Sequence, residues 1–209
     1  MRPLGRLHLI TDTRPGRDAV AVVAAALAAG APVVQVRVED GASDREAYDL
    51  AARIKELCDA HGATCLVNDR LHVALAVGAG GGHVGDDDLP VAAARRVLGP
   101  AAVLGATCRD PASARAAVAA GATYLGVGPA YDTSTKAGLP AAIGPAGIGA
   151  VAAAVPDTPV IAIGGVTAAR VASLLAAGAY GVAVVGAVSG APDPALAVRE
   201  LLHALRVPA

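Results

Sequence analysis

Short apolar runs alternate with longer Ala-rich segments eight times along the chain, and the runs are almost wholly apolar. That pattern is typical of parallel strands that are covered on both faces by helices. The expected strands span residues 7–11, 33–37, 64–68, 82–85, 102–107, 124–128, 160–164 and 181–185. The expected helices span residues 18–29, 43–61, 70–77, 90–98, 110–120, 147–154, 167–177 and 194–205. Eight such units predict an α/β fold, a (β/α)8 TIM barrel that forms a single domain over residues 1–209.

Proline and glycine positions agree with these boundaries. Pro90, Pro111 and Pro194 suit the first turns of helices. Glycines stand where helix ends belong, at positions 30, 62, 99, 121 and 178. A doubly wound open sheet is the main competing architecture, but it usually has fewer strands. No Gly-x-Gly-x-x-Gly follows the first expected strand, which weakens the dinucleotide-binding version of that fold.

Composition narrows the class of protein. Hydrophobic residues make up 55% of the 209 residues but aromatic residues only 2%, so Ala, Val and Leu must fill the core. The net charge of −1 argues against nucleic acid or an anionic membrane as the main partner. No apolar run approaches the roughly 18 residues of a membrane span. Three cysteines without metal-type spacing are expected to be buried thiols, and we expect a cytoplasmic protein.

Polar residues cluster at the expected carboxyl ends of the strands, which form the active-site face of such a barrel. Gln35 and Arg37 are two positions apart on one strand, so both should point into the barrel mouth. Thr107 ends another strand. The long loop after residue 128 carries Thr133, Thr135 and Lys136, a set of hydroxyls and an ammonium suited to phosphate oxygens.

Two anion sites are expected at this face. Asp69 and one of Asp86–Asp88 offer hard oxygen ligands of the kind that Mg²⁺ prefers, with water or phosphate completing its shell. Together with Arg37 and Lys136, such an ion would hold a diphosphate. Glycines after the last two strands, at 164–165 and 186, occupy the place where barrels bind a single phosphate through backbone N–H groups.

Each of these features has a plainer interpretation. Asn68-Asp69 suits a helix N-cap, and Asp86–Asp88 suits a solvated acidic turn before a proline. Arg37 could pair with a nearby carboxylate, and the glycine pairs could be simple turns. His83, between two glycines, is expected to be a packed, hydrogen-bonded histidine rather than a catalytic base. The functional interpretation gains weight because all these residues fall on one face of one predicted barrel.

Eight motifs in this order closely resemble the thiamine phosphate synthase / thiazole tautomerase family, and they span nearly the whole chain. The strongest are Val-Gln-Val-Arg at 34–37, Val-Asn-Asp-Arg at 67–70 and Gly-Pro-x-x-x-Thr-x-Thr-Lys at 128–136. The others are Leu-Ile-Thr-Asp at 9–12, His-Val-Gly-x-x-Asp-Leu-Pro at 83–90, Leu-Gly-Ala-Thr at 104–107, Ile-Ala-Ile-Gly-Gly-Val at 161–166 and Val-Ala-Val-Val at 182–185.

The resemblance implies a barrel enzyme that joins hydroxymethylpyrimidine diphosphate to hydroxyethylthiazole phosphate and releases pyrophosphate, with Mg²⁺ as cofactor. By motif match, the pyrimidine diphosphate would contact Gln35, Arg37, Asn68, Thr107 and Lys136. The metal would be bound by Asp69 and Asp88. The thiazole phosphate would be held by Thr133, Ser134, Thr135, Gly164, Gly165, Val185 and Gly186. Arg37 and Lys136 would be catalytic by stabilising the charge of the departing pyrophosphate.

Three departures from the family pattern bear on this reading. Glu39 stands where synthases have a Lys for the diphosphate, which changes the local charge by two units. Asp86 stands in place of the usual Gln, and Thr107 in place of the usual Ser. A site with more acid and less base should bind diphosphate less well, unless Mg²⁺ binds more tightly or Glu39 turns outward.

Two other functions remain open beside the synthase. A thiazole tautomerase of the same fold would need neither diphosphate nor metal, but that branch often has a His where this chain has Pro129. A non-catalytic binder of thiazole phosphate is the third. We expect small-molecule substrates, no nucleic acid and no membrane partner, and the sequence leaves a homo-oligomer open.

Overall fold

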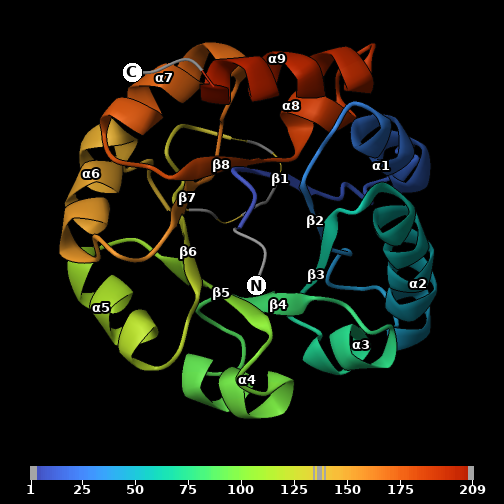
Figure 1. Ribbon diagram of the computed structural model, residues 1–209, viewed down its shortest axis with the longest axis horizontal. Coiled ribbons are helices and arrows are strands. Elements are labelled where there is room, and N and C mark those ends of the chain that lie inside the picture. Colours follow the sequence, from blue (N-terminus) through green and yellow to red (C-terminus); the bar gives the residue numbers. More distant parts are fainter. Residues whose placement is uncertain (1–3, 134, 136–137, 139, 207–209) are drawn as a thin grey trace.

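A closed barrel of eight parallel strands, ringed by helices, forms the molecule in the computed structural model, which describes residues 4–133, 135, 138 and 140–206 (Figure 1). The strands are β1 (Leu7–Ile10), β2 (Val33–Val36), β3 (Thr64–Asn68), β4 (Gly81–Val84), β5 (Val103–Cys108), β6 (Tyr124–Val127), β7 (Val160–Ala162) and β8 (Gly181–Val184). Neighbours in sequence pair in order, and β1 pairs with β8 from Leu7 opposite Val182 to close the barrel. The predicted (β/α)8 fold is confirmed.

Helices follow each strand on the outside of the barrel (Figure 1). They are α1 (Ala19–Ala28), α2 (Asp44–His61), α3 (Leu71–Ala76), α4 (Val91–Leu98), α5 (Pro111–Ala119), α6 (Gly144–Ala154), α7 (Ala168–Ala176), α8 (Gly186–Ser189) and α9 (Pro194–Arg206). Local chemistry sets several starts. Ser43 and Glu46 form a capping box on α2, and the Asp18 carboxylate caps α1 by accepting a hydrogen bond from Ala21 N.

Two helices differ from the prediction. Helix α6 begins at Gly144 rather than Gly147, because Pro145 at its first turn has the fixed φ that starts a helix. Helix α8 was not predicted at all. It has four residues directly after β8, too few for a hydrophobic period to reveal.

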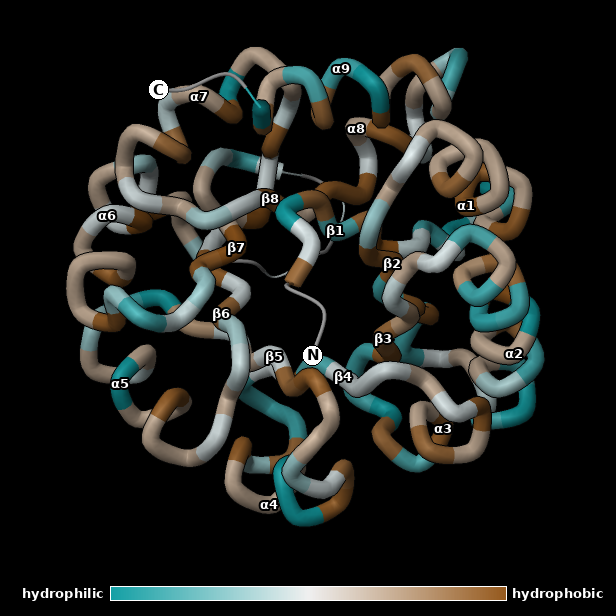
Figure 2. Tube along the Cα trace, in the orientation of Figure 1, coloured by the Kyte–Doolittle hydropathy of each residue, from teal (hydrophilic) through white to brown (hydrophobic). Residues whose placement is uncertain are grey.

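The apolar residues form two layers. One large cluster packs the outward side chains of the strands, such as Leu9 and Val34, against the helices. A smaller cluster fills the inside of the barrel and includes Ile10, Leu66 and Tyr124. Figure 2 shows hydrophobic residues along the strands and the more hydrophilic colours mainly on the outer helices and loops. The inner cluster is small, so polar side chains share the barrel interior.

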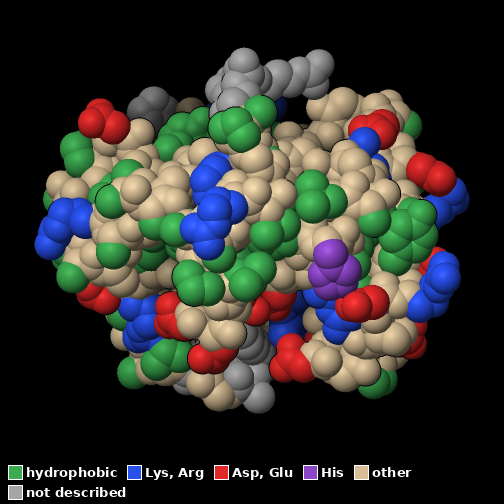
Figure 3. Space-filling model, turned by 90° about the horizontal axis from the view of Figure 1, so that it is seen from below, with side chains coloured by type: hydrophobic (Ala, Val, Ile, Leu, Met, Phe, Trp, Pro, Cys, Tyr) green, Lys and Arg blue, Asp and Glu red, His purple; other side chains and the backbone are tan. Residues whose placement is uncertain are grey.

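The outer surface carries charge of both signs. In the side view of Figure 3, acidic and basic side chains lie close together along the lower edge, and this face has no continuous basic area. That agrees with the near-zero net charge of the chain. Among the described residues, no helix is both long enough and apolar enough to cross a bilayer.

Candidate active site

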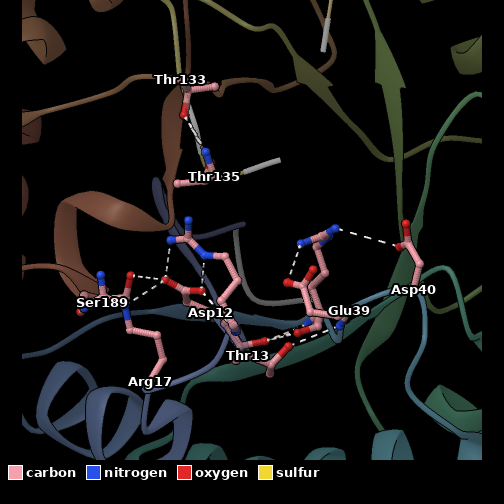
Figure 4. Close-up of polar contacts among 11 residues, drawn as sticks. Asp12, Thr13, Arg17, Glu39, Asp40, Thr133, Thr135 and Ser189 are labelled. Atoms are coloured by element: carbon pink, nitrogen blue, oxygen red, sulfur yellow. Dashed lines mark hydrogen bonds and ion pairs between the residues drawn. The ribbon is translucent and has the colours of Figure 1, made fainter. Parts of the chain in front are cut away.

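The ends of β1 and β2 are joined by side-chain hydrogen bonds at the barrel mouth. The Thr11 hydroxyl donates to Arg37 O at 2.6 Å and accepts from Arg37 N at 2.8 Å. Two residues further along both segments, Glu39 N donates to the Thr13 hydroxyl at 3.1 Å. These bonds fix the backbone from which Arg37 and Glu39 project (Figure 4).

Arg37 pairs with carboxylates, as the plainer interpretation allowed. Its guanidinium lies 3.6 Å from Glu39 and 3.9 Å from Asp40. Arg37 is mostly buried, with 18% of its side chain exposed, whereas the Asp40 side chain is 94% exposed. Ion pairs of this length to solvent-exposed carboxylates are weak, so Arg37 keeps the capacity to bind a stronger anion.

The interpretation of Asn68-Asp69 as a helix N-cap is wrong. Helix α3 begins at Leu71, and its N-cap is Arg70, without a side-chain cap. Asp69 instead has φ of 60°, a left-handed conformation that is rare for a residue with a Cβ. Its N–H donates to His83 O at 2.8 Å, which holds it in that conformation. Strained backbone of this kind is concentrated at functional sites.

A small pocket lies between the ends of β2 and β3. Its volume is about 190 Å³, and it is lined by Val38, Glu39, Asp40, Asn68, Asp69 and Arg70. Arg70, which lines this pocket, also pairs with Asp44 at 2.9 Å, at the start of α2. The predicted residues Asn68 and Asp69 therefore share one hollow with Glu39.

Of the three consecutive aspartates after β4, one turns inward. Asp88 is half-buried and accepts a hydrogen bond from Gly85 N at 2.7 Å, whereas Asp86 and Asp87 are exposed. Asp86 and Asp87 therefore fit the solvated turn, and the metal-ligand role of Asp88 stays a prediction. Asp88 and Asp69 therefore project from the ends of adjacent strands.

The donor chemistry at these two strand ends fits Mg²⁺. Each of the two strand ends offers a carboxylate, a hard oxygen donor, and Mg²⁺ is usually bound by one or two carboxylates plus water and phosphate. Within residues 4–133, 135, 138 and 140–206, no group of three or more His, Cys, Asp or Glu is placed to bind a metal by itself. A metal here would accordingly depend on substrate phosphate.

A buried hydrogen-bond chain connects Gln35 to Thr107 through the barrel interior. Gln35 Nε2 donates to the Tyr124 hydroxyl at 3.3 Å, and this hydroxyl lies 2.9 Å from His83 Nδ1. His83 Nε2 lies 3.0 Å from the Thr107 hydroxyl oxygen. His83 is thus the packed, hydrogen-bonded histidine that the sequence predicted, and sequence reasoning missed the role of Tyr124.

Burial keeps the histidine of this hydrogen-bond chain neutral. It lowers the pKa of His83 to about 4, so the imidazole is neutral near neutral pH and has one N–H. In the tautomer with the proton on Nε2, the Tyr124 hydroxyl accepts from Gln35 and donates to His83 Nδ1, and Nε2–H donates to the Thr107 hydroxyl. In that tautomer Thr107 keeps its own O–H to donate to another group. An O–H donor suits an anionic oxygen.

The opposite side of the mouth forms a wider cavity of about 600 Å³. It is lined by Asp132, Thr133, Gly165, Val166, Thr167, Arg170, Gly186 and Ala187. Gly164 and Gly165 both have positive φ, at 93° and 61°, and a Cβ on Gly165 would lie 2.5 Å from Asp132 O. Here glycine is required for the β6 and β7 loops to approach each other closely.

Three of the seven residues predicted to hold the thiazole phosphate line this cavity: Thr133, Gly165 and Gly186. The Thr133 and Thr135 hydroxyls are 3.1 Å apart (Figure 4), and Thr135 packs over Gly186, whose Cβ would lie 3.1 Å from Thr135 Cγ2. Val185 is the N-cap of α8. Ser134 and Lys136, which were predicted to belong to the same loop, lie outside the described residues.

Sequence reasoning also missed Arg170, which lines this cavity from α7. Its Nη1 donates to Gly165 O at 2.5 Å, and its guanidinium lies 4.3 Å from the centre of the Tyr131 ring. Nothing in the sequence pattern separates it from an ordinary surface arginine of a helix. It brings a positive charge to the rim of the cavity.

Comparison with known proteins agrees with this geometry. The family model described as thiamine monophosphate synthase matches residues 7–188. The chain belongs to the thiamine monophosphate synthase family. It is 67% identical to a thiamine-phosphate synthase of Salinispora tropica over 98% of this chain and 99% of that one. It is 66% identical to the thiamine-phosphate synthase of Salinispora arenicola, with the same coverage of 98% and 99%.

A solved structure gives the same result for the fold. A thiamine phosphate pyrophosphorylase from Pyrococcus furiosus superposes with a TM-score of 0.86 at 34% identity, over 96% of this chain and 95% of that one. Membership of the thiamine monophosphate synthase family makes this chain an enzyme of thiamine biosynthesis, in the transferase class. The predicted family is confirmed.

Proposed function

We propose that the chain transfers the hydroxymethylpyrimidine group from its diphosphate to hydroxyethylthiazole phosphate, giving thiamine phosphate and pyrophosphate. The observation that carries this proposal is the division of one barrel mouth into two hollows. One is lined by Asn68 and Asp69, and the other by Gly165, Gly186 and Thr133. A reaction that joins two phosphorylated molecules needs two such anion sites side by side.

The pyrimidine diphosphate belongs at the β2–β5 side. Arg37 and Asn68 would bind its phosphate oxygens, joined by Lys136 from the loop after β6, and the Thr107 hydroxyl would donate a hydrogen bond there. Gln35, whose amide nitrogen is committed to Tyr124 at 3.3 Å, keeps its Oε1 to accept from the amino group of the pyrimidine. Specificity for an aminopyrimidine would follow from that fixed orientation.

Mg²⁺, held by Asp69 and Asp88, would supply positive charge next to the diphosphate oxygens. The protein's part is to hold the diphosphate so that its negative charge, which grows as the C–O bond breaks, faces Arg37 and Lys136. The electron-rich ring supports the resulting methylene cation. The two electrons of the broken bond leave with pyrophosphate, so no side-chain nucleophile and no proton transfer are required.

The thiazole phosphate belongs at the cavity beside α7 and α8. Backbone N–H groups near Gly165 and Gly186 and the hydroxyls of Thr133 and Thr135 would hold its phosphate, together with Ser134 of the same loop. Anchoring the phosphate would direct the thiazole nitrogen at the methylene carbon, where it forms the new C–N bond. Orientation of this kind is worth several orders of magnitude in rate.

Relatives at 66% and 67% identity that carry the synthase name favour this function over the tautomerase. The test is to supply the purified chain with both precursors together and with each alone. Thiamine phosphate and pyrophosphate should form in equal amounts, and only with both. Aromatisation of a thiazole phosphate without any pyrimidine would instead assign an isomerase. Binding of thiazole phosphate with no turnover would assign a non-catalytic binder.

The buried, free cysteines Cys58, Cys65 and Cys108 suit a reducing compartment, and we propose that the enzyme works in the cytoplasm.

A further inference from the structure

The loop after β1 holds two arginines on one buried carboxylate. Asp12 has only 2% of its side chain exposed. Arg14 grips it with two parallel bonds, Nε to Oδ1 at 2.8 Å and Nη2 to Oδ2 at 2.7 Å. Arg17 Nε lies 3.7 Å from the same Oδ2. One carboxylate therefore pairs with two guanidinium groups, and the three side chains together have a net charge of +1.

The same carboxylate ties this loop to the phosphate side of the mouth. The Ser189 hydroxyl, at the end of α8, donates to Asp12 Oδ2 at 2.6 Å, and Arg17 Nη1 donates to Ser189 O at 3.0 Å (Figure 4). Helix α8 begins at Gly186, one of the predicted phosphate-binding residues. Asp12 is therefore fixed by its hydrogen bond from Ser189. It in turn fixes the guanidinium of Arg14.

Arg14 also lies next to the diphosphate side. Its neighbour Thr13 is bonded to Glu39 N at 3.1 Å, and Thr11 is bonded to Arg37 on the same strand end. The hydrogen bonds that Arg14 donates to Asp12 are the main cause that raises the pKa of Arg14, and the charge of Glu39 adds to it. Arg14 is thus between the end of β2 and the start of α8.

The guanidinium of Arg14 has binding capacity to spare. Asp12 takes up Nε and Nη2, and within the described part of the chain no hydrogen bond is assigned to Nη1. A third of the side chain is exposed, 33%, so this end of the guanidinium reaches solvent. A guanidinium fixed by a buried carboxylate loses little further entropy when it binds an anion.

We propose that Arg14 is a further substrate-binding residue, which binds the diphosphate of the pyrimidine substrate and is held in place by Asp12. The inference rests on the proposed function. Arg37 faces Glu39 and Asp40, so the end of β2 carries more negative than positive charge. An anion as highly charged as a diphosphate needs further cations there, and Arg14 is the fixed cation beside that end.

The experiment compares Arg14→Gln, Arg14→Lys and Arg17→Gln. Arg17 is the matched control, because it contacts the same carboxylate and its side chain is similarly exposed, 41%. Binding of inorganic pyrophosphate in the presence of Mg²⁺ is measured by calorimetry, and KM is measured separately for each precursor. Circular dichroism and thermal unfolding verify that each variant is folded.

Arg14→Gln should weaken pyrophosphate binding and raise KM for the pyrimidine diphosphate by about tenfold, the loss of one charge-assisted hydrogen bond. KM for the thiazole phosphate should not change. Arg14→Lys keeps the charge without the two-pronged guanidinium, so its pyrophosphate binding should weaken less. Arg17→Gln should bind pyrophosphate as well as the wild type.

Three results would overturn the role of Arg14: unchanged pyrophosphate binding in Arg14→Gln, an effect on the thiazole phosphate alone, or an equal loss in Arg17→Gln. Wild-type protein that binds pyrophosphate but forms no thiamine phosphate would overturn the proposed function and leave the comparison of Arg14 variants intact. Wild-type protein that binds no pyrophosphate would overturn both.

Discussion

Glu39 brings a negative charge to the strand end where an anion is expected. Its carboxylate lies 3.6 Å from Arg37, and nearly half of its side chain is exposed, 46%. Its backbone N–H, rather than its side chain, makes the bond to Thr13. The local fold therefore does not depend on the carboxylate, and its main effect is to reduce the charge that Arg37 offers to a substrate.

Glu39→Lys should accordingly leave turnover equal or higher and lower KM for the pyrimidine diphosphate several-fold. Glu39→Gln should give an intermediate change, because it removes a charge without adding one. Steady-state kinetics with each precursor varied in turn provide the measurement. A collapse of turnover in Glu39→Lys would mean that the carboxylate has a function of its own.

Tyr124 links Gln35 and His83 in the buried hydrogen-bond chain. Tyr124→Phe leaves the Gln35 amide and His83 Nδ1 without their shared hydroxyl, which normally lies 3.3 Å and 2.9 Å away. We expect KM for the pyrimidine diphosphate to rise about fivefold or more, with a loss of about 1–3 kcal/mol in the free energy of unfolding. KM for the thiazole phosphate should stay the same.

Tyr180→Phe is the matched control, because its hydroxyl donates to Leu4 O at 2.7 Å, at the N-terminal end of the barrel. This variant should change neither KM. If Tyr124→Phe raised both KM values equally, the hydroxyl would act on the fold alone.

At the scale of elements, the sequence predicted which residues lie at the strand ends, but not which side chains touch inside the barrel. Parallel strands bring residues after each strand to one rim, so Arg37, Asn68, Asp88 and Thr107 could be assigned to one face from their positions alone. Which of them touch could not be predicted, because that depends on side chains from strands distant in sequence. Tyr124 resembled an ordinary core aromatic, and Asp12 resembled an ordinary residue after a strand.

Glycines on β5 and β6 make space for the buried His83–Tyr124 pair. A Cβ on Gly105 would lie 2.2 Å from Tyr124 Cζ and 2.3 Å from His83 Nδ1, and one on Gly126 would lie 2.9 Å from His83 Cε1. Two of the eight strands therefore lack side chains where the polar chain crosses the interior. The small residues of β5 and β6 are part of the site's construction.

Gly105→Ala should displace both rings, since neither has free space inside the barrel. We expect a loss of more than about 2 kcal/mol in the free energy of unfolding, measured by urea denaturation. Gly41→Ala is the control, because nothing lies within 4 Å of the added Cβ there. Equal stability of the two variants would contradict the account of the interior.

For the whole molecule, two buried histidines make stability depend on pH. Burial is the main cause that lowers the pKa of His8 to about 3 and of His83 to about 4, from 6.5 in the unfolded chain. Below pH 6.5 the unfolded chain therefore binds protons that the folded chain excludes. Their stabilising contribution is fully present above pH 6.5 and is lost as the pH falls toward 4 and then 3.

Between pH 6.5 and 4.5, each histidine should lower the free energy of unfolding by up to about 1.4 kcal/mol per pH unit. Urea denaturation at several pH values gives the slope. In His8→Asn the slope should fall by about half, since one of the two titrating groups is gone. A free energy of unfolding that does not change from pH 7.5 to 5 would contradict the burial of neutral histidines.

The global architecture was the easiest feature to predict. Eight apolar runs separated by Ala-rich helices leave few alternatives to a closed parallel barrel. Two features were not predicted, because neither depends on a hydrophobic period. The short helix α8 is a single turn directly after a strand, and the earlier start of α6 comes from Pro145. The placement of the candidate site residues on one rim followed from the barrel.

The most direct test of the central claim is the Mg²⁺ dependence of thiamine phosphate formation by the purified protein. Both precursors are supplied with Mg²⁺, with chelator, and with Mg²⁺ restored, for the wild type and for Asp69→Asn and Asp88→Asn. The account predicts product only with Mg²⁺, and a higher Mg²⁺ requirement in both variants. Full activity in chelator, or variants with an unchanged requirement, would contradict a diphosphate site built on these two aspartates.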